Sequence, residues 1–400
     1  MFAYACEPDR GSEPGAGWGL VRTVAQFADC VVLVGPEHGP GLRRREVEAG
    51  NPALRFVEIP EPMGAASAKL HRVTWFLLYL AWLRRADAVG RRLHREDPFD
   101  LTFHATYSTY WLPTPATSYG VPCVWGPVGG AVVTPLRLWP LLGFRGICGE
   151  MLDLVSVNLL SALPATRRTW RRATVTLVQN PTTLERLPES VRATSKILNH
   201  AFFTEAPSLP RTGTGAGPCL FVGSLVARKG PRLAVRALSH APPEVELVFL
   251  GDGSERRPLA RLARRLGVAD RVRFEGQVSR TEALARMAQA STVVFTGLRE
   301  EGGIALAEAL LLGVPVIVLD HGGAGTVAGA AIDKERVALI QPESIETAAQ
   351  RIGEAMGRFR SASRRSDAPL IDHAAWMEEL REAFDAALGR VPEADVPART

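Results

Sequence analysis

The chain has 400 residues, of which 46% are hydrophobic and 22% are charged. This length and composition exclude a disordered, collagen-like or disulfide-stapled chain and favour two or three globular domains over a single core. The formal net charge of +5 comes from 47 basic and 42 acidic residues, an excess too small to indicate a nucleic-acid partner.

The cysteines and the N-terminus indicate a cytoplasmic protein. The five cysteines lie far apart, mostly in apolar segments, so we expect reduced, buried thiols. No basic region followed by an apolar stretch opens the chain, which predicts no secretory signal. Because the first apolar run begins at residue 2, the sequence leaves open whether the natural chain starts a few residues earlier.

Short apolar runs alternate with helix-like stretches in the first half of the chain. Brief runs rich in valine and aromatic residues predict buried strands at 2–6, 30–34, 56–59, 101–104, 122–125 and 175–178. Residues 204–218 (TEAPSLPRTGTGAGP) are rich in proline, glycine and threonine and predict a linker.

A second alternation follows the linker. It predicts strands at 219–222, 245–250, 272–274, 292–295 and 315–319, with helices near 231–239, 256–266, 281–290, 304–312 and 372–388. Such alternation favours parallel sheets with helices on both faces, which bind ligands beyond the carboxyl ends of their strands. We therefore expect an N-terminal domain (1–203), a linker (204–218), a C-terminal domain (219–368) and a final helix (369–390) that packs back across the domains.

The segment 221–230 (FVGSLVARKG) predicts a strand, a turn at Gly223 and a basic loop that opens a helix. This arrangement suits a diphosphate, because glycine allows close approach of the backbone and Arg228 and Lys229 supply positive charge. The next helix adds free N–H groups and the positive end of its dipole. Taken alone, the motif favours the alternative, a solvated turn that carries basic residues.

The segment 299–313 (REEGGIALAEALLLG) places two acids, Glu300 and Glu308, eight positions apart. Eight residues are a little over two helical turns, so both carboxylates can point into one cleft. Gly302 and Gly303 let the start of the helix approach a ligand closely. The alternative is an amphipathic helix with acids in its first turns, which the helix dipole favours.

Five blocks of the second half resemble, in order, the retaining nucleotide-sugar glycosyltransferases of the GT-B fold, family 4 (glycosyl transferases group 1). They are FVGSLVARKG, LVFLGDGSERRPL, VRFEGQVSRTEAL, VVFTGLREEGGIALAEALLLGVPVIV and DHGG. The resemblance implies an α/β protein of two Rossmann-like, doubly wound domains facing a cleft. It also implies transfer of a hexose-type sugar from a nucleoside diphosphate sugar to a hydroxyl acceptor, with no other cofactor.

The resemblance assigns roles to individual residues. Arg228 and Lys229 would neutralise the donor diphosphate, Glu308 would hydrogen-bond the ribose hydroxyls, and Glu300 would act beside the transferred sugar as a catalytic group. His321, beside two glycines, would reach the donor. Further donor contacts are implied for Gly17, Gly223, Gly276, Val278, Gly302, Gly303 and Ile304.

The N-terminal half adds two glycine-rich segments and a histidine. Residues 11–19 (GSEPGAGWG) predict a flexible loop after the first strand, and residues 125–130 (WGPVGG) predict a second loop. Neither is a G-x-G-x-x-G fingerprint, and no Walker A motif occurs, which disfavours a dinucleotide oxidoreductase. We expect His104, at a strand end, to line the cleft as a catalytic residue; the alternatives are a core histidine and, for the second loop, a plain turn.

Three departures from the family pattern leave rival functions open. Ser224 stands where many members have arginine, Trp125 and Pro127 occupy a region where a histidine is common, and Thr326 replaces an acid. A catalytically degenerate sugar-nucleotide-binding homologue is therefore one alternative, and a GT-B epimerase or phosphorylase is another.

No Asp-x-Asp pair occurs in the sequence, so we expect metal-independent transfer. Arg228, Lys229 and helix N-termini would balance the charge on the leaving nucleoside diphosphate. The resemblance implies attack on the same face as the leaving phosphate, with a donor phosphate oxygen as the base.

Two apolar, arginine-flanked segments, 73–85 and 134–172, can lie on an anionic membrane surface or pack as ordinary domain helices. The apolar run at 73–83 has 11 residues, whereas a spanning helix needs about 20. We therefore expect a cytoplasmic protein, with peripheral contact at the inner face of a membrane as a further option. A lipid-linked saccharide, a polysaccharide intermediate and a small metabolite all fit as acceptors, and no nucleic-acid partner is expected.

Overall fold

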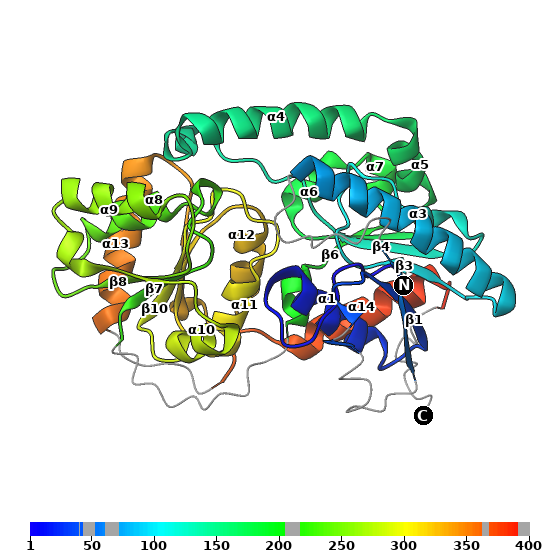
Figure 1. Ribbon diagram of the computed structural model, residues 1–400. Coiled ribbons are helices and arrows are strands. Elements are labelled where there is room, and N and C mark those ends of the chain that lie inside the picture. The colour runs from blue at the N-terminus through cyan, green and yellow to red at the C-terminus, as the bar shows by residue number, and fades with distance from the viewer. Residues whose placement is uncertain (40, 43–52, 61–71, 205–216, 362–367, 391–400) are drawn as a thin grey trace, which may run out of the picture.

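The computed structural model describes residues 1–39, 41–42, 53–60, 72–204, 217–361 and 368–390. Two α/β units, each built on parallel strands, lie side by side (Figure 1). This architecture confirms the expectation of two Rossmann-like, doubly wound domains. Most of the linker predicted at 204–218 lies outside the described residues.

The C-terminal domain contains a six-stranded parallel sheet in the order β12-β11-β10-β7-β8-β9. Its strands are β7 (Cys219–Val222), β8 (Leu247–Leu250), β9 (Val272–Gly276), β10 (Thr292–Phe295), β11 (Val316–Leu319) and β12 (Val337–Ile340). The chain winds outward from β7 in one direction and then returns to wind the other way from β10. The order of strands therefore reverses between β7 and β10, the place where open α/β sheets bind ligands.

Helices cover both faces of this sheet. One face packs under α8, α9 and α13 in one apolar cluster, and the other packs under α10, α11 and α12 in a second. The helical elements are η5 (Ala227–Lys229), α8 (Pro231–Leu238), α9 (Arg256–Arg265), η6 (Ala269–Arg271), α10 (Arg280–Met287), α11 (Ile304–Leu311), α12 (Gly322–Gly329), η7 (Lys334–Arg336) and α13 (Ile345–Ser361).

The N-terminal domain has a two-stranded and a four-stranded parallel sheet that adjoin at Phe2, which bridges to Leu33 on one side and His104 on the other. The strands are β1 (Cys30–Val34), β2 (Leu54–Glu58), β3 (Thr102–His104), β4 (Cys123–Val128), β5 (Val175–Val178) and β6 (Ser195–Ile197). The strand predicted at 2–6 is reduced to this bridge. Its end leaves the sheet because the N–H of Ala5 bonds the hydroxyl of Thr106 at 3.2 Å instead of a strand.

The helices of this half connect the strands and cover the sheet. They are α1 (Ser12–Val24), α3 (Arg72–Glu96), η2 (Pro115–Ser118), η3 (Leu136–Leu141), α4 (Gly143–Ser161), α5 (Pro164–Arg172), α6 (Pro181–Arg186), α7 (Glu189–Arg192) and η4 (His200–Phe203).

Both predicted glycine loops of this half were wrong in conformation. Residues 12–24 form helix α1, and its glycines serve close packing, since a Cβ at Gly17 would lie 2.1 Å from the carbonyl oxygen of Ala5. At Gly19 a Cβ would lie 1.7 Å from the carbonyl oxygen of Phe203. Strand β4 continues through Val128, because a shift in its pairing with β5 absorbs the Gly-Pro step.

The segment after β4 crosses from one domain to the other. Leu138, Leu141 and Leu142 lie in the apolar core of the C-terminal domain, although we placed this stretch in the N-terminal one. Helix α4 then runs above both domains, at the top of Figure 1, and α5 returns the chain to the N-terminal domain. Among the described residues no single helix is long and apolar enough to cross a membrane; α4 and α5 satisfy that test only together, across a bend of 67°.

The last described helix, α14 (His373–Ala387), lies against the N-terminal domain. Phe384 meets the rings of Phe27 and Phe103 edge-on, at centroid distances of 5.4 Å and 5.2 Å. Trp376 stacks on Phe202 at 3.8 Å. The C-terminal end of the described chain thus completes the core of the N-terminal half.

We expect Phe384→Ala to lower the free energy of unfolding by about 3–5 kcal/mol, because it leaves a cavity between two aromatic rings. Urea denaturation followed by tryptophan fluorescence measures the change. Glu378→Ala, on the exposed face of the same helix, is the matched control and should change stability by less than about 0.5 kcal/mol. Equal effects of the two variants would contradict the packing of α14 described above.

Candidate functional site

Two loops meet where the strand order of the C-terminal sheet reverses. One follows β7 and the other follows β10. The N–H groups of Leu298 and Arg299 both donate to the carbonyl oxygen of Arg228, at 2.9 Å and 3.2 Å. A Cβ at Gly230 would lie 1.8 Å from the carbonyl oxygen of Thr296, so only glycine fits there. The two loops are therefore in direct backbone contact.

An ion pair joins the same two loops. The ammonium of Lys229 contacts the carboxylate of Glu300, and both side chains remain partly accessible, at 28% and 19%. Arg228 is exposed beside them. Gly223, directly after β7, has a φ of 137° and open space where a side chain would lie. Gly223, Arg228 and Lys229, predicted from the segment 221–230, thus gather where the strand order reverses between β7 and β10. We call this place the switch point.

Three helices begin next to this ion pair. Helix α8 starts after Gly230, α11 after Gly303 and α12 after His321, and in none of the three does a side chain cap the first turn. Gly303 has a φ of 86°, a left-handed conformation that favours glycine. In α12 the N–H of Gly323 donates to the carbonyl oxygen of Glu300 at 2.8 Å. First turns without a side-chain cap otherwise leave N–H groups available, and the positive ends of the dipoles favour an anion.

Glu308 lies on α11, four residues after Ile304, the first residue of that helix. Its side chain is 7% exposed and accepts a hydrogen bond of 2.8 Å from Nε of Arg280, at the start of α10. Burial raises the pKa of Glu308, and the charge of Arg280 opposes that rise. The two acids predicted to share a cleft are therefore held by different cations, and the sequence motif gave no sign of Arg280.

Gly276 and Val278, two further residues predicted to contact the donor, lie between β9 and α10. Gly276 has a φ of 78° and accepts a hydrogen bond of 2.7 Å from the N–H of Gly251. Val278 packs against the apolar cluster that contains α11. Ile304 is the first residue of α11 and packs on the same cluster.

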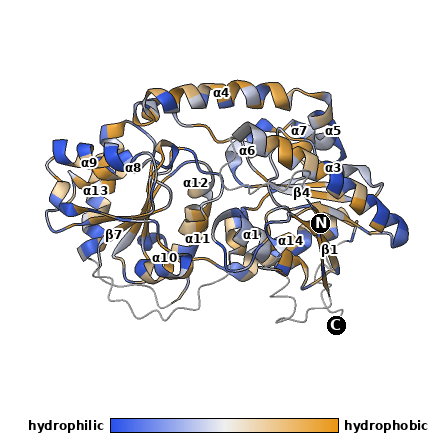
Figure 2. Cartoon of the chain, viewed as in Figure 1, coloured by the Kyte–Doolittle hydropathy of each residue, from blue (hydrophilic) through white to orange (hydrophobic). Residues whose placement is uncertain are grey.

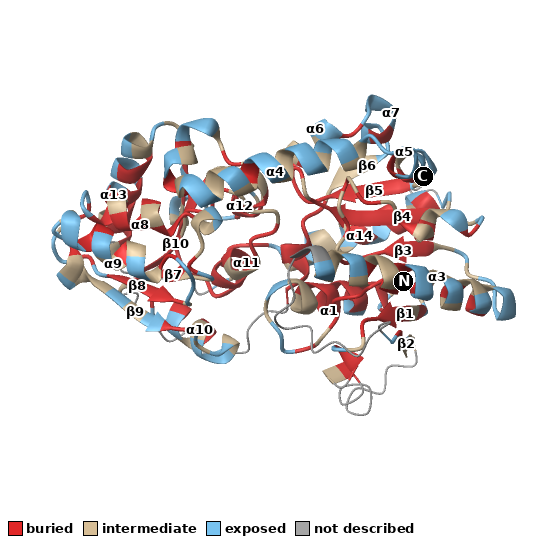
Figure 3. Cartoon of the chain, turned by 45° about the horizontal axis from the view of Figure 1, so that its top comes forward, coloured by how far each residue is buried: buried red, intermediate tan, exposed pale blue. Residues whose placement is uncertain are grey.

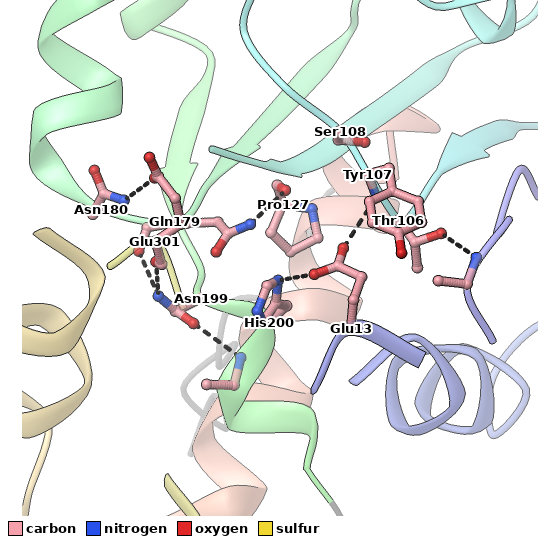
Figure 4. Close-up of polar contacts among 12 residues, drawn as sticks. Glu13, Thr106, Tyr107, Ser108, Pro127, Gln179, Asn180, Asn199, His200 and Glu301 are labelled. Atoms are coloured by element: carbon pink, nitrogen blue, oxygen red, sulfur yellow. Dashed lines mark hydrogen bonds and ion pairs between the residues drawn. The ribbon is translucent and has the colours of Figure 1, made fainter. Parts of the chain in front are cut away.

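The N-terminal domain faces this region with Glu13 and His200 (Figure 4). One carboxylate oxygen of Glu13 accepts the N–H of Tyr107 at 3.0 Å, and the other lies 3.6 Å from Nδ1 of His200. A Cβ at Gly302 would lie 2.3 Å from Nε2 of His200. Gly302 is therefore required because a histidine of the other domain sits against it, a reason that no local motif reveals.

Glu301 joins the two domains. Its carboxylate accepts the N–H of Val132 at 3.0 Å. It also accepts the side-chain amide of Asn180 at 3.0 Å (Figure 4). Its carbonyl oxygen accepts the amide of Asn199 at 3.0 Å. Desolvation raises the pKa of Glu301, and the bonds from Asn180 and the backbone of Val132 and Gly130 oppose that rise.

Two more contacts extend this interdomain junction. Arg299 pairs with Asp153 of α4 at 2.7 Å and with Glu150 at 3.4 Å. Nε2 of His321 lies 2.7 Å from the carbonyl oxygen of Val133. His321, which we predicted to reach the donor, thus also contacts the N-terminal domain.

His104 and Gly17 lie inside the N-terminal domain. His104 is 2% exposed, its Nε2 is hydrogen-bonded to the hydroxyl of Tyr79 at 3.0 Å, and burial lowers its pKa to about 4. This position does not match the cleft-lining histidine that we predicted, because helix α3 covers the end of β3. Gly17 faces the backbone of Ala5 and the side chain of Thr106. Glu13 and His200 are among the polar groups that face the C-terminal domain.

The described residues contain no group of three or more His, Cys, Asp or Glu side chains placed to hold a metal ion.

Comparison with known proteins shows which family the C-terminal part of the chain resembles and which fold the chain has. Residues 216–363 match the family described as Glycosyl transferases group 1. The D-inositol 3-phosphate glycosyltransferase of Xylanimonas cellulosilytica is 39% identical over 112 residues, 27% of each chain. The alignments with this and other curated relatives span 27% to 33% of those proteins.

Two solved structures extend the likeness to nearly the whole chain. Anabaena HepE in complex with UDP and glucose has a TM-score of 0.55 at 16% identity and covers 96% of this chain and 99% of its own. Sucrose-phosphate synthase from Thermosynechococcus elongatus has a TM-score of 0.55 at 15% identity and covers 97% and 96%. These likenesses show that the chain has the GT-B fold.

Glu301→Ala should loosen the interdomain junction, because it leaves the N–H of Val132 and the amide of Asn180 without an acceptor. Losing one buried hydrogen bond costs about 1–3 kcal/mol. We expect amide hydrogen exchange at Val132 to accelerate by on the order of 10-fold or more. Glu335→Ala, an exposed glutamate of the same domain, is the control. Unchanged protection at Val132 in Glu301→Ala would contradict the junction.

The pH dependence of stability provides a separate test of the buried charge. Because the pKa of Glu301 is raised on folding, its ionised form costs stability, and this cost grows as pH rises through the raised pKa. The unfolding free energy of the wild type should therefore fall relative to that of Glu301→Gln as pH rises from about 4, the ordinary pKa of a glutamate, through the raised pKa of the folded state. Urea unfolding of both proteins across this range measures the difference. A difference that is constant, or that grows in favour of the wild type as pH rises, would contradict it.

Proposed function

We propose that this protein is a glycosyltransferase that moves a sugar from a nucleoside diphosphate sugar to a hydroxyl acceptor, with retention of anomeric configuration. The observation that carries the proposal is the ion pair of Lys229 and Glu300 at the switch point of the C-terminal sheet, beside three uncapped helix N-termini. This arrangement lies within the region that matches the Glycosyl transferases group 1 family.

The basic residues of the first loop suit the donor diphosphate. Arg228 is exposed, and Lys229 is partly accessible and neutralised by Glu300 in the free protein. A bound diphosphate would compete with Glu300 for the ammonium and receive N–H donors from the helix N-termini. Glu300 would then be free to accept hydrogen bonds from hydroxyls of the transferred sugar. Since these groups supply the positive charge, we propose transfer without a divalent metal.

Glu308 suits the ribose of the donor. Arg280 occupies one of its carboxylate oxygens, and the other oxygen can accept a ribose hydroxyl. Arg280 also limits the rise in the pKa of Glu308 that burial causes, which favours the ionised acceptor form. Gly276 and Val278, in the neighbouring turn, are proposed to flank the base.

In the proposed reaction, the oxygen of the acceptor hydroxyl forms a bond to the anomeric carbon. The bond between that carbon and the diphosphate oxygen breaks, and its electron pair leaves with the nucleoside diphosphate. The acceptor proton passes to a phosphate oxygen on the same face of the sugar. Arg228, Lys229 and the helix N-termini stabilise the negative charge that develops on the leaving group.

The acceptor would approach from the N-terminal domain. His200 lies on that side, directly against Gly302, with Glu13 beside it, and the two side chains can orient an acceptor hydroxyl. HepE was solved with UDP and glucose, and the Xylanimonas relative is named for D-inositol 3-phosphate. We propose a nucleotide-sugar donor on this basis, and lipid-linked, polysaccharide and small-metabolite acceptors all remain candidates.

Glu300→Gln keeps the shape of the side chain and removes its charge. We expect hydrolysis of the donor sugar in the absence of acceptor to fall by about 100-fold in kcat, because the sugar is no longer oriented. Glu343→Gln, which alters an ion pair at the start of α13, is the matched control and should retain full turnover. Proton NMR of the first product formed measures retention, which the proposal requires.

The rival functions give different results in the same assays. A catalytically degenerate homologue would bind a nucleotide sugar and show no turnover in the wild type. A phosphorylase would require inorganic phosphate for turnover. An epimerase would convert the donor and would transfer no sugar to an acceptor. A product with inverted anomeric configuration would contradict retention, but it would not contradict the proposed donor site.

A further inference from the structure

Helix α4 carries large apolar side chains on its outer surface. Phe144 is 82% exposed, Leu152 71% and Leu159 67%. Figure 2 shows much of this helix in the colour of hydrophobic residues, and Figure 3 shows exposed and intermediate residues alternating along it. Most of the large hydrophobic side chains recorded as exposed in the described residues lie between Leu136 and Leu163. Such a concentration marks an interaction surface rather than scattered surface residues.

These side chains form one stripe. Residues 144, 148, 151, 152, 155 and 159 recur at intervals of three and four, which places them on one face of a helix. The opposite side carries Glu150 and Asp153, and both pair with Arg299 of the C-terminal domain. The carboxylates of α4 therefore point away from the stripe, and we call this outward surface the α4 face.

Arginines flank the α4 face at both ends. Arg137 and Arg145 are exposed near its N-terminal end. Helix α5, which follows its C-terminal end, contains no acidic residue and exposes four arginines, Arg167, Arg168, Arg171 and Arg172. A surface with apolar residues in the centre and arginines around them complements a sheet of apolar chains bounded by anions.

An arginine-lined pocket adjoins the start of α4. It has a volume of about 580 Å³ and is lined by Arg232, Arg236, Arg261, Arg264 and Arg265, together with Pro140 and Leu141 of η3. Arg232 pairs with Glu255. The buried Nε of Arg236 has no hydrogen-bond acceptor among the described residues. The pocket therefore offers several guanidinium charges, one of them with an unsatisfied donor, to an anionic group.

We propose that the α4 face docks on an anionic membrane surface, with its apolar stripe among the upper acyl chains and the arginine pocket on a lipid phosphate. The stripe alone would suit any apolar partner. The arginines at both ends and the orphaned donor in the pocket favour a phosphate-bearing lipid surface over a neutral one. This inference concerns where the protein lies and does not depend on the proposed transfer reaction.

Vesicle co-sedimentation of the full chain tests the proposal. The probes are phosphatidylcholine vesicles with and without phosphatidylglycerol. We expect the wild type to bind the anionic vesicles and to be released by high salt, since surface charge attracts arginine over about one Debye length. Binding to neutral vesicles should be weaker by on the order of 100-fold.

Two variants separate the apolar and the charged contributions. Phe144→Ser, Leu152→Ser and Val155→Ser combined should weaken binding to anionic vesicles by at least about 10-fold. Arg261→Gln, Arg264→Gln and Arg265→Gln combined should weaken it by on the order of 100-fold and reduce the dependence on salt. The matched controls are Ile332→Ser with Leu339→Ser, and Arg273→Gln with Arg381→Gln, all at exposed positions outside both apolar, arginine-flanked segments.

Three results would overturn the proposal. One is equal binding of the wild type to neutral and anionic vesicles, or none to either. Another is a loss of binding in the control variants that matches the loss in the test variants. The third is a wild type that forms a dimer in solution, by light scattering, that the serine variant dissolves, because the α4 face would then be covered by a second copy. Circular dichroism verifies that each variant is folded.

Discussion

A carboxylate that is buried against a neighbouring domain must find hydrogen-bond donors there, and Glu301 of the C-terminal domain does so through Val132 and Asn180 of the N-terminal one. This constraint fixes how the glycine-rich start of α11 meets the N-terminal domain, and it brings His200 against Gly302. Each hydrogen bond contributes only about 1 kcal/mol net. The junction therefore holds one arrangement of the two domains through hydrogen bonds that are individually weak.

The charges at the switch point are neutralised within the free protein. Lys229 pairs with Glu300, and Arg280 pairs with Glu308. A nucleotide diphosphate entering there would replace one of these carboxylate contacts with phosphate and release the carboxylate for hydroxyl groups of the ligand. The same residues would thus serve stability in the free state and recognition in the bound state. The segment that leads into α4 belongs to this arrangement, because its leucines anchor in the C-terminal core beside the arginine pocket.

The alternation of strands and helices was sufficient to predict the fold class, since parallel strands need helical crossovers. It also located the helix at 304–312, observed as α11 over residues 304–311. The prediction of a flexible loop was wrong where glycines allow close packing of a helix against the backbone of another segment, as in α1. Prediction from sequence also failed where partners lie far apart in the chain: the partners of Glu301 and of Gly302 are set by tertiary packing, and no spacing within one segment contains them. The roles of Glu300 and Glu308 toward a donor stay predictions.

The proposed function requires that a nucleoside diphosphate sugar bind at the switch point through Lys229. Thermal unfolding of the wild type, Lys229→Gln and the exposed control Lys334→Gln, each with UDP-, GDP-, ADP- and dTDP-sugars, tests it most directly, because a ligand that binds only the native state raises its stability. We predict that sugars of one nucleotide raise the unfolding temperature of the wild type and the control and leave Lys229→Gln unchanged. Equal shifts in all three proteins, or no shift in the wild type at millimolar ligand, would contradict the account.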